Sequence, residues 1–245
     1  MGQERANSTE QGLTGLVSHF DARASNFVTP LAANGYAADD DTMASHRHYD
    51  IVLDEILGFM PIGAADRFLE IGCGTGELLA RIARRAATAR GAEISSGMAA
   101  ASRARGLAVD LYDGRRLPYP DSSFDKILVF SVIINIPAAD AIDALIADAL
   151  RILAPGGTLM IGSTPHPARS VFPTHATAAA AVSWRGRLAA LVGRTPPPIG
   201  CFSVPVAAFE KFLAFPGVDS LRAAWPRSSY NGSADRYHVA ISRGR

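Results

Sequence analysis

The stretch LEIGCGTG, residues 69–76, decides the fold. It begins within a short apolar strand, expected over residues 67–71. It then leads through three glycines into a helix that carries Leu78 and Ile82. Glycine adopts positive φ angles at little cost and lets a ligand approach the backbone closely. The N-terminus of the following helix adds a partial positive charge. A strand, a glycine loop and a helix in this order predict a site for a nucleotide-type ligand.

The spacing of the glycines narrows the choice of ligand. Gly72, Gly74 and Gly76 form G-x-G-x-G, whereas the dinucleotide fingerprint is G-x-G-x-x-G. Glu70 stands two residues before the first glycine and would repel a pyrophosphate. The same carboxylate would attract an ammonium group. The loop therefore favours a cationic ligand over NAD.

Short apolar segments alternate with amphipathic segments along most of the chain. This alternation predicts a parallel sheet with helices on both faces. The expected strands are residues 67–71, 89–94, 107–111, 125–132, 158–162, 221–225 and 237–242. The expected helices are residues 42–60, 96–104, 138–153 and 206–215, together with the one after the glycine loop.

Three further motifs follow the glycine loop in order. Glu93-Ile94-Ser95 precedes Met98; Asp113 precedes LPYPD at residues 117–121 and SFD at residues 123–125; LAPGG occupies residues 153–157. On these motifs, residues 67–163 resemble the core of the class I S-adenosylmethionine-dependent methyltransferases, in the small-molecule branch often called methyltransferase type 11. One glycine motif is a weak signal, but four motifs at the family's spacing are a strong one.

The resemblance implies an α/β fold: a Rossmann-like, seven-stranded, mostly parallel sheet with helices on both faces and an antiparallel last strand. This domain is expected over residues 61–245. We expect residues 1–60 to form an N-terminal helical lid, with a frayed polar start over residues 1–15. Residues 164–205 have proline-rich ends and a helical candidate at about 175–192. So long a connection predicts an inserted cap over the acceptor.

The family's motifs imply the cofactor contacts. Glu70 and the loop backbone would hold the methionine end of S-adenosylmethionine, and Glu93 would accept hydrogen bonds from both ribose hydroxyls. Met98 would pack on the adenosine, although helix packing explains it equally well. Asp113 would accept from the adenine amino group, although Asp before Gly is also a turn sequence. The implied cofactor-binding residues are Glu70, Gly72, Gly74, Gly76, Glu93, Ile94, Met98, Asp113, Gly114 and Ser131.

The resemblance predicts a methyltransferase that uses in-line displacement from a sulfonium. The donor is already activated, so the protein mainly aligns the reactants and excludes water. A base is needed only if the acceptor loses a proton. Candidates for a catalytic residue are His166, after the expected fifth strand, and Asn135, four residues after Ser131, where relatives frequently carry His.

The predicted acceptor is an O or N atom of a small molecule, a natural product or a sugar-type metabolite. Four arginines of the cap suit an anionic acceptor, although a solvated helix face is the simpler explanation. They are Arg169, Arg185, Arg187 and Arg194. Two rival functions remain: a non-catalytic methyltransferase-fold partner or cofactor-binding regulator, and an NAD-dependent oxidoreductase.

Composition limits the other partners. The net charge of +1 lacks the basic excess of nucleic-acid modules. The longest uncharged apolar stretch, residues 127–139 after Lys126, is too short to span a bilayer. The two cysteines cannot form a four-thiolate metal site, and Cys73 inside the glycine loop favours a reduced, cytoplasmic setting. We expect no metal, no nucleic acid and no membrane, and a monomer or homodimer.

Overall fold

The computed structural model describes residues 2–26, 29–34, 42–174, 201–230 and 233–245. Its centre is a seven-stranded sheet with the strand order β3-β2-β1-β4-β5-β7-β6. Only β7 runs against the others, because it pairs antiparallel with both β5 and β6. The expected mostly parallel fold is therefore confirmed. The strands are β1 Arg67–Ile71, β2 Thr88–Glu93, β3 Val109–Leu111, β4 Phe124–Phe130, β5 Leu153–Pro165, β6 Val218–Ala224 and β7 Arg236–Arg243.

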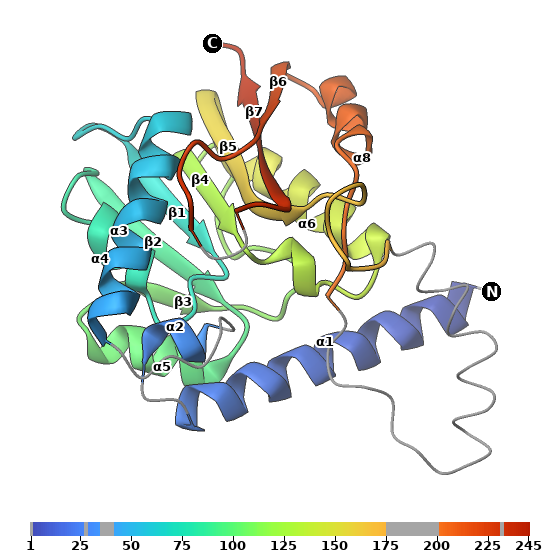
Figure 1. Ribbon diagram of the computed structural model, residues 1–245. Coiled ribbons are helices and arrows are strands. Elements are labelled where there is room, and N and C mark those ends of the chain that lie inside the picture. Colours follow the sequence, from blue (N-terminus) through green and yellow to red (C-terminus); the bar gives the residue numbers. More distant parts are fainter. Residues whose placement is uncertain (1, 27–28, 35–41, 175–200, 231–232) are drawn as a thin grey trace, which may run out of the picture.

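Helices cover both faces of this sheet (Figure 1). Apolar side chains of α3, α4 and α5 form one buried cluster, and those of α6, α8 and η2 form the other. The helices are α1 Gly2–Asn26, α2 Pro30–Ala33, α3 Thr42–Phe59, α4 Glu77–Ile82, α5 Ser96–Ala104, α6 Ala139–Ile152 and α8 Ala207–Glu210. Two 3-10 turns, η1 Ile133–Asn135 and η2 Lys211–Ala214, complete the described elements.

The local sequence explains these elements. α6 buries Ile142, Leu145, Ile146 and Ala149 on one face, the spacing of an amphipathic helix. Ser95 precedes α5 as its N-cap, and its hydroxyl accepts a hydrogen bond from the Met98 N–H at 3.1 Å, as an N-cap serine does.

The strand order places the site. β1 lies between β2 and β4, with Glu70 paired to Gly91 on one side and to Leu128 on the other. From β1 the chain proceeds to β2 and β3 on one side, and it then crosses back to form β4 on the other side of β1. In open parallel sheets, ligands bind outside the carboxyl ends of the strands at such a switch point.

Three expected boundaries differ from the structure. β5 extends from Leu153 to Pro165, because Leu153, the first residue of the 153–157 motif, already pairs with Phe124 of β4. The helix expected over residues 206–215 divides into α8 and η2. The N-terminal residues are helical from Gly2 onward instead of frayed.

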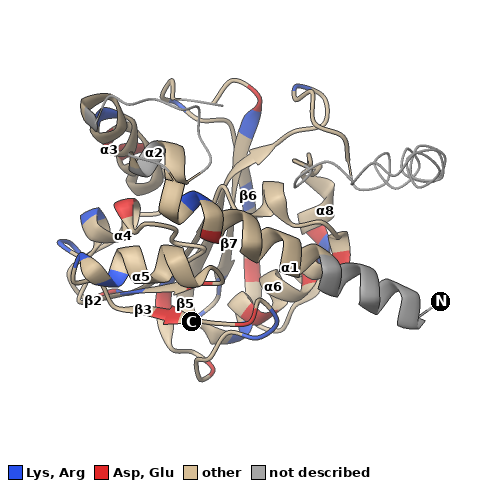
Figure 2. Ribbon diagram, turned by 90° about the horizontal axis from the view of Figure 1, so that it is seen from below, with Lys and Arg blue, Asp and Glu red and all other residues tan. Residues whose placement is uncertain are grey.

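Helix α1 passes along the carboxyl edge of the sheet, below the strands in Figure 1 and across the middle of the view in Figure 2. Asp21 fastens it to α5: one carboxylate oxygen accepts from the Ser95 hydroxyl at 2.6 Å and from the Gly97 N–H at 2.9 Å. Arg23 donates from Nε to the Ala33 carbonyl at 3.1 Å and so ties α1 to α2.

The two described ends of the insertion lie together. Thr174 and Ser203 form a parallel bridge, and the Ser203 N–H donates to the Pro173 carbonyl. The Phe202 N–H donates to the Ile134 carbonyl, so this stem sits on η1. The expected helix at 175–192 and Arg185, Arg187 and Arg194 lie outside the described residues.

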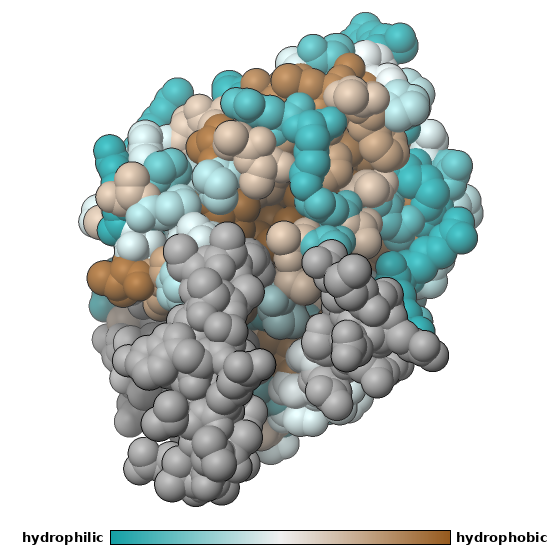
Figure 3. All heavy atoms as spheres, turned by 90° about the vertical axis from the view of Figure 1, so that its right-hand side faces the viewer, coloured by the Kyte–Doolittle hydropathy of each residue, from teal (hydrophilic) through white to brown (hydrophobic). Residues whose placement is uncertain are grey.

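The surface of the described residues is mixed. Acidic and basic residues are interspersed along the ribbon in the view from below (Figure 2). Apolar areas lie between polar ones on the side shown in Figure 3. Within the described ranges, no helix is long and apolar enough to cross a membrane. Nor do these residues contain a cluster of three metal-ligating side chains.

Candidate functional site

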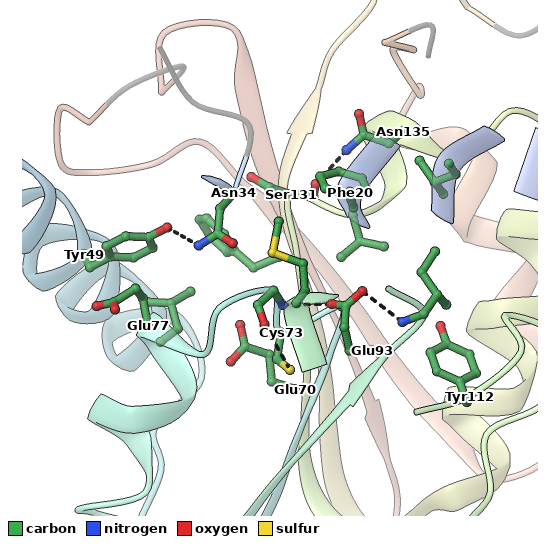
Figure 4. Close-up of a pocket in the computed structure, with 18 residues that line it drawn as sticks. Phe20, Asn34, Tyr49, Glu70, Cys73, Glu77, Glu93, Tyr112, Ser131 and Asn135 are labelled. Atoms are coloured by element: carbon green, nitrogen blue, oxygen red, sulfur yellow. Dashed lines mark hydrogen bonds between the residues drawn. The ribbon is translucent and has the colours of Figure 1, made fainter. Parts of the chain in front are cut away.

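A cleft of about 780 Å³, counted with its open mouth, lies at the carboxyl ends of β1, β2 and β4. Side chains from α1 and α3, and that of Asn34 directly after α2, also line it (Figure 4). The lining residues are Leu16, Phe20, Asn34, Tyr49, Glu70, Gly72, Cys73, Gly74, Glu77, Leu78, Glu93, Ile94, Met98, Tyr112, Phe130, Ser131, Val132 and Asn135.

The glycine loop is crowded as well as left-handed. Gly72 has φ +71°, and a Cβ there would come within 2.5 Å of Val132 Cγ2. Gly74 has φ +54°, and a Cβ there would collide with the Asn34 Oδ1. Left-handed backbone disfavours any residue with a side chain. Both positions therefore require glycine, so that the backbone itself forms the pocket wall.

Four N–H groups of this loop already donate hydrogen bonds within the protein. Gly72 donates to the Ala92 carbonyl at 2.7 Å and Gly76 to the Cys73 carbonyl at 2.9 Å. Gly74 donates to Glu93 at 2.8 Å, and Thr75 to the Asn34 Oδ1 at 3.2 Å. Phosphate-binding loops depend on free N–H groups that point at the anion. This arrangement is unsuited to a pyrophosphate.

Glu70 is a buried carboxylate that faces the pocket. Its residue is 4% exposed, and its Oε2 atom is shielded from solvent without a hydrogen-bond partner. Burial, followed by the charge of Glu93, raises the pKa of Glu70 well above its ordinary value, although the Leu79 N–H opposes the shift. A buried carboxylate is costly unless a partner compensates it. Glu70 is therefore suited to a cationic ligand group.

Glu93 ends β2 and holds two loops together. Its Oε2 accepts from the Gly74 N–H, and its Oε1 accepts from the N–H groups of Ile94 at 2.9 Å and Ser95 at 3.0 Å. The residue is 5% exposed, and burial raises the pKa of its carboxyl group. A carboxylate has about four acceptor positions. Glu93 thus spends most of its capacity on the backbone.

The third acidic residue of the cleft is compensated. Glu77 Oε2 lies 2.7 Å from Arg81 Nη1, and its Oε1 pairs with Arg105. The negative charge that faces the cleft therefore comes from Glu70 and Glu93. Together with the occupied loop N–H groups, these carboxylates suit a ligand that carries positive charge and no phosphate.

Most of the expected cofactor residues line this one cleft. They are Glu70, Gly72, Gly74, Glu93, Ile94, Met98 and Ser131, and Asn135 joins them. Ser131 has the unusual φ of +56° at the end of β4, and its carbonyl accepts from Asn135 Nδ2 at 3.5 Å. Gly76 lies behind the loop instead, packed against Leu107 and Ser102.

Asp113 and His166 are not among the lining residues. Asp113 Oδ1 accepts from the Arg115 N–H at 2.9 Å, which is a turn-forming bond, and these hydrogen bonds lower the pKa of Asp113. Gly114 lies beside Leu13 of α1. His166 Nδ1 accepts from the Ala168 N–H at 3.2 Å, and its ring packs against Trp225 and Tyr237.

The sequence predicted an N-terminal lid, but not the individual contacts that this part of the chain makes in the cleft. Asn34 Nδ2 donates to the Tyr49 hydroxyl at 2.6 Å while its Oδ1 accepts from the Thr75 N–H, so it bridges α3 and the glycine loop (Figure 4). Phe20 and Leu16 of α1 add an apolar wall. Tyr112 was also missed, although it stands directly before the expected Asp113.

Residues 69–161 match the model of a family described as "Methyltransferase domain". The demethylmenaquinone methyltransferase of Tropheryma whipplei is 35% identical over 117 residues, which are 46% of this chain and 47% of that protein. The 27-O-demethylrifamycin SV methyltransferase of Amycolatopsis mediterranei is 31% identical over 53% of this chain and 51% of that protein. The chain thus spans about half the length of these curated relatives.

Solved structures share the fold at low sequence identity. The phosphoethanolamine N-methyltransferase 1 of Haemonchus contortus gives a TM-score of 0.63 at 11% identity, over 96% of this chain and 50% of that one. The magnesium protoporphyrin IX methyltransferase of Synechocystis with bound S-adenosylhomocysteine gives 0.55 at 15% identity, over 83% and 85%. The family-model match identifies residues 69–161 as a methyltransferase domain, and the seven-stranded sheet around them has the Rossmann-like fold of these solved methyltransferases.

Proposed function

We propose that this protein transfers a methyl group from S-adenosylmethionine to an oxygen or nitrogen atom of a small molecule, a natural product or a sugar-type metabolite. The curated relatives support this substrate class, because their names cover a quinone precursor and a rifamycin. A cytoplasmic location and a monomeric or homodimeric state remain predictions.

One observation carries the proposal: a solvent-shielded, unpaired Glu70 oxygen faces a cleft whose loop N–H groups are already bonded. S-adenosylmethionine fits this chemistry, because it has an ammonium and a sulfonium and no phosphate. NAD fits poorly, because its pyrophosphate would meet the carboxylates of Glu70 and Glu93 beside a loop in which four N–H groups are already bonded.

The chain's own residues would act by binding and orientation. S-adenosylmethionine, when bound, supplies a methyl group that is already activated by its sulfonium. Glu70 would hold the cationic end, and Leu16 and Phe20 would keep water out of the cleft. Ser131 and Asn135 would face the reacting side from the end of β4. Alignment and water exclusion of this kind can supply much of the rate enhancement of a displacement.

The cleft lining in the described residues contains no histidine. This observation keeps a cofactor-binding regulator as the second candidate function, since such a protein would bind the cofactor without turnover.

The first test is calorimetric titration with S-adenosylmethionine, S-adenosylhomocysteine and NAD. We expect micromolar binding of both adenosyl ligands and none of NAD. Methyl-labelled donor is then incubated with a panel of hydroxylated and amino-bearing small molecules, and NMR locates the label on O, N or C. Binding without transfer to any acceptor would favour the regulator, and binding of NAD alone would overturn the proposal.

We also propose that residues 1–60 act as a lid and residues 164–205 as the acceptor cap. The bridge between Thr174 and Ser203 closes the stem of the cap beside η1. Replacing residues 176–200 by a short Gly-Ser linker should leave S-adenosylhomocysteine affinity unchanged and abolish methylation. Full activity of this variant would show that the segment is not the acceptor cap.

A further inference from the structure

A second charged position lies beside the cleft, at the start of β7. Because β7 runs antiparallel, its first residue, Arg236, reaches the same edge as the carboxyl ends of the parallel strands, where it pairs with Pro165 of β5. Ser131 directly follows the neighbouring strand β4, and its N–H donates to the Gly162 carbonyl of β5. One strand therefore separates Arg236 from the wall of the cleft.

The Arg236 guanidinium is largely enclosed and underused. Its side chain is 14% exposed. Nη1 donates to the Ser163 hydroxyl at 3.0 Å, whereas Nε is shielded from solvent and has no hydrogen-bond partner. The carboxylate of Asp235 is 3.9 Å from Nε, beyond hydrogen-bond distance. A buried guanidinium normally meets a carboxylate in a bidentate pair.

Among the described residues, the carboxylate paired with Arg236 is that of Asp235, which lies at ion-pair distance only. Burial, and second the positive charge of Arg236, lower the pKa of His48 of α3 to about 4. This ring is therefore neutral at physiological pH. Burial raises the pKa of the Cys201 thiol, at the described end of the insertion, and the positive charge of Arg236 opposes this rise.

These neighbours come from the elements that surround the reacting side. His48 precedes Tyr49, which lines the cleft from α3. Cys201 precedes Phe202, which is bonded to η1 next to Asn135. Arg236 thus lies among α3, β5 and the stem of the insertion.

We propose that the Arg236 guanidinium forms a subsite for an acidic group of the acceptor, a carboxylate or a phosphate. The inference rests on the proposed function, which it refines by naming the acceptor as an anion. The free edge of a guanidinium offers two parallel N–H donors to such a group. The anion would give Nε the partner it lacks and position the acceptor beside the end of β4. None of the four arginines singled out from the sequence is needed for this role.

The test uses benzoate, benzamide and phenyl phosphate as probes of the full-length protein saturated with S-adenosylhomocysteine. Dissociation constants are measured by ligand-observed NMR. The variants are Arg236→Met, which removes the charge, and Arg236→Lys, which keeps the charge without the planar fork. Arg85→Met, at an exposed arginine after α4, is the matched control for loss of one positive charge.

We expect wild type to bind benzoate or phenyl phosphate and not benzamide, at millimolar or lower concentration; the tighter anion identifies the acidic group. Arg236→Met should weaken that binding at least about tenfold, as expected when a charged hydrogen bond is lost. Arg236→Lys should give an intermediate value, and Arg85→Met should match wild type. The affinity for S-adenosylhomocysteine should stay within about twofold in all variants, which also shows that they are folded.

Equal binding of benzoate and benzamide, no binding of either anion, or unchanged anion binding in both Arg236 variants would overturn the subsite. If Arg236→Met fails to fold, the comparison of Arg236→Lys with Arg85→Met still decides. If wild type binds the anions in an Arg236-dependent manner but does not bind S-adenosylhomocysteine, the proposed methyl transfer fails while the anion site stands.

Discussion

The Glu93 carboxylate accepts a hydrogen bond from the Gly74 N–H at 2.8 Å and so joins the end of β2 to the loop after β1. The two residues are 19 positions apart in the chain and meet because β1 and β2 are parallel neighbours. This bond fixes the carboxylate at the floor of the cleft. It also removes a donor that a phosphate would need, so one contact serves both the shape and the charge of the site.

Glu93→Gln tests this contact. The amide keeps one accepting oxygen but presents N–H donors where the backbone N–H groups of Gly74 or Ile94 lie, so at least one hydrogen bond is lost. Hydrogen bonds to charged groups contribute about 1.5–3 kcal/mol each. We expect S-adenosylhomocysteine affinity to fall at least about tenfold, measured by calorimetry. Unchanged affinity would show that Glu93 neither shapes the loop nor contacts the ligand.

Glu70→Gln should make the free protein more stable at neutral pH. Burial raises the pKa of Glu70 above the ordinary 4.5. The native state then holds this proton more tightly than the unfolded state, so the free energy of unfolding falls as pH rises from about 4.5 toward the native pKa. The amide is neutral throughout and removes this penalty.

We expect a Tm increase of about 2–4 °C for each kcal/mol gained at pH 7.5, and no difference near pH 4. S-adenosylmethionine affinity should drop, because the amide cannot balance an ammonium group. Glu77→Gln is the matched control: it breaks the pairs with Arg81 and Arg105 and should lower Tm. Destabilisation by Glu70→Gln at neutral pH would mean that its charge is already compensated.

The central part of the site could be predicted because its residues stand at fixed distances from the ends of strands. Glu70, Glu93 and Ser131 each follow from a local motif, and the parallel sheet brings the three ends to one edge. The strand pattern was likewise sufficient for the fold. The bounds of a strand did not follow from this pattern where a residue of a turn motif also pairs with a neighbouring strand, as Leu153 does with β4.

The rest depends on tertiary contacts that no local pattern encodes. Asn34 reaches Thr75 across 41 residues, and the polar stretch that contains it has no motif. Arg236 was missed because its importance comes from what surrounds it and not from its neighbours in the chain. Asp113 shows the opposite case: the motif is present, but in this structure its carboxylate bonds to the Arg115 N–H at 2.9 Å.

Asp21→Asn should loosen the lid. Hydrogen bonds from Gly97 and Ser95 lower the pKa of Asp21 below its ordinary 3.8. Its contribution to stability is therefore present at neutral pH and is lost as pH falls through that range. We expect a loss of about 1 kcal/mol at pH 7, typical of a removed capping carboxylate, with little difference near pH 2.

Hydrogen exchange gives the specific readout for this lid contact. Amides of α1 should exchange faster in Asp21→Asn, while those of β4 stay protected. Dissociation of S-adenosylhomocysteine should also be faster, since Leu16 and Phe20 of the same helix wall the cleft. Ser25→Ala, at an exposed serine one turn further on, is the control and should resemble wild type. Uniformly faster exchange would indicate a general loss of stability.

Gly74→Ala and Gly106→Ala separate crowding in the site from backbone strain. Both glycines have positive φ, +54° and +81°, so both alanines carry a cost of about 1–2 kcal/mol. A Cβ at Gly106 meets nothing within 4 Å, whereas one at Gly74 collides with the Asn34 carboxamide that covers the loop. We therefore expect both variants to have a lower Tm, and only Gly74→Ala to lose S-adenosylhomocysteine binding.

Displacing Asn34 would free the Thr75 N–H and move the wall formed by α2 and α3, since Asn34 also bonds to Tyr49. If Gly74→Ala binds as tightly as Gly106→Ala, the contact between Asn34 and the loop does not shape the ligand site.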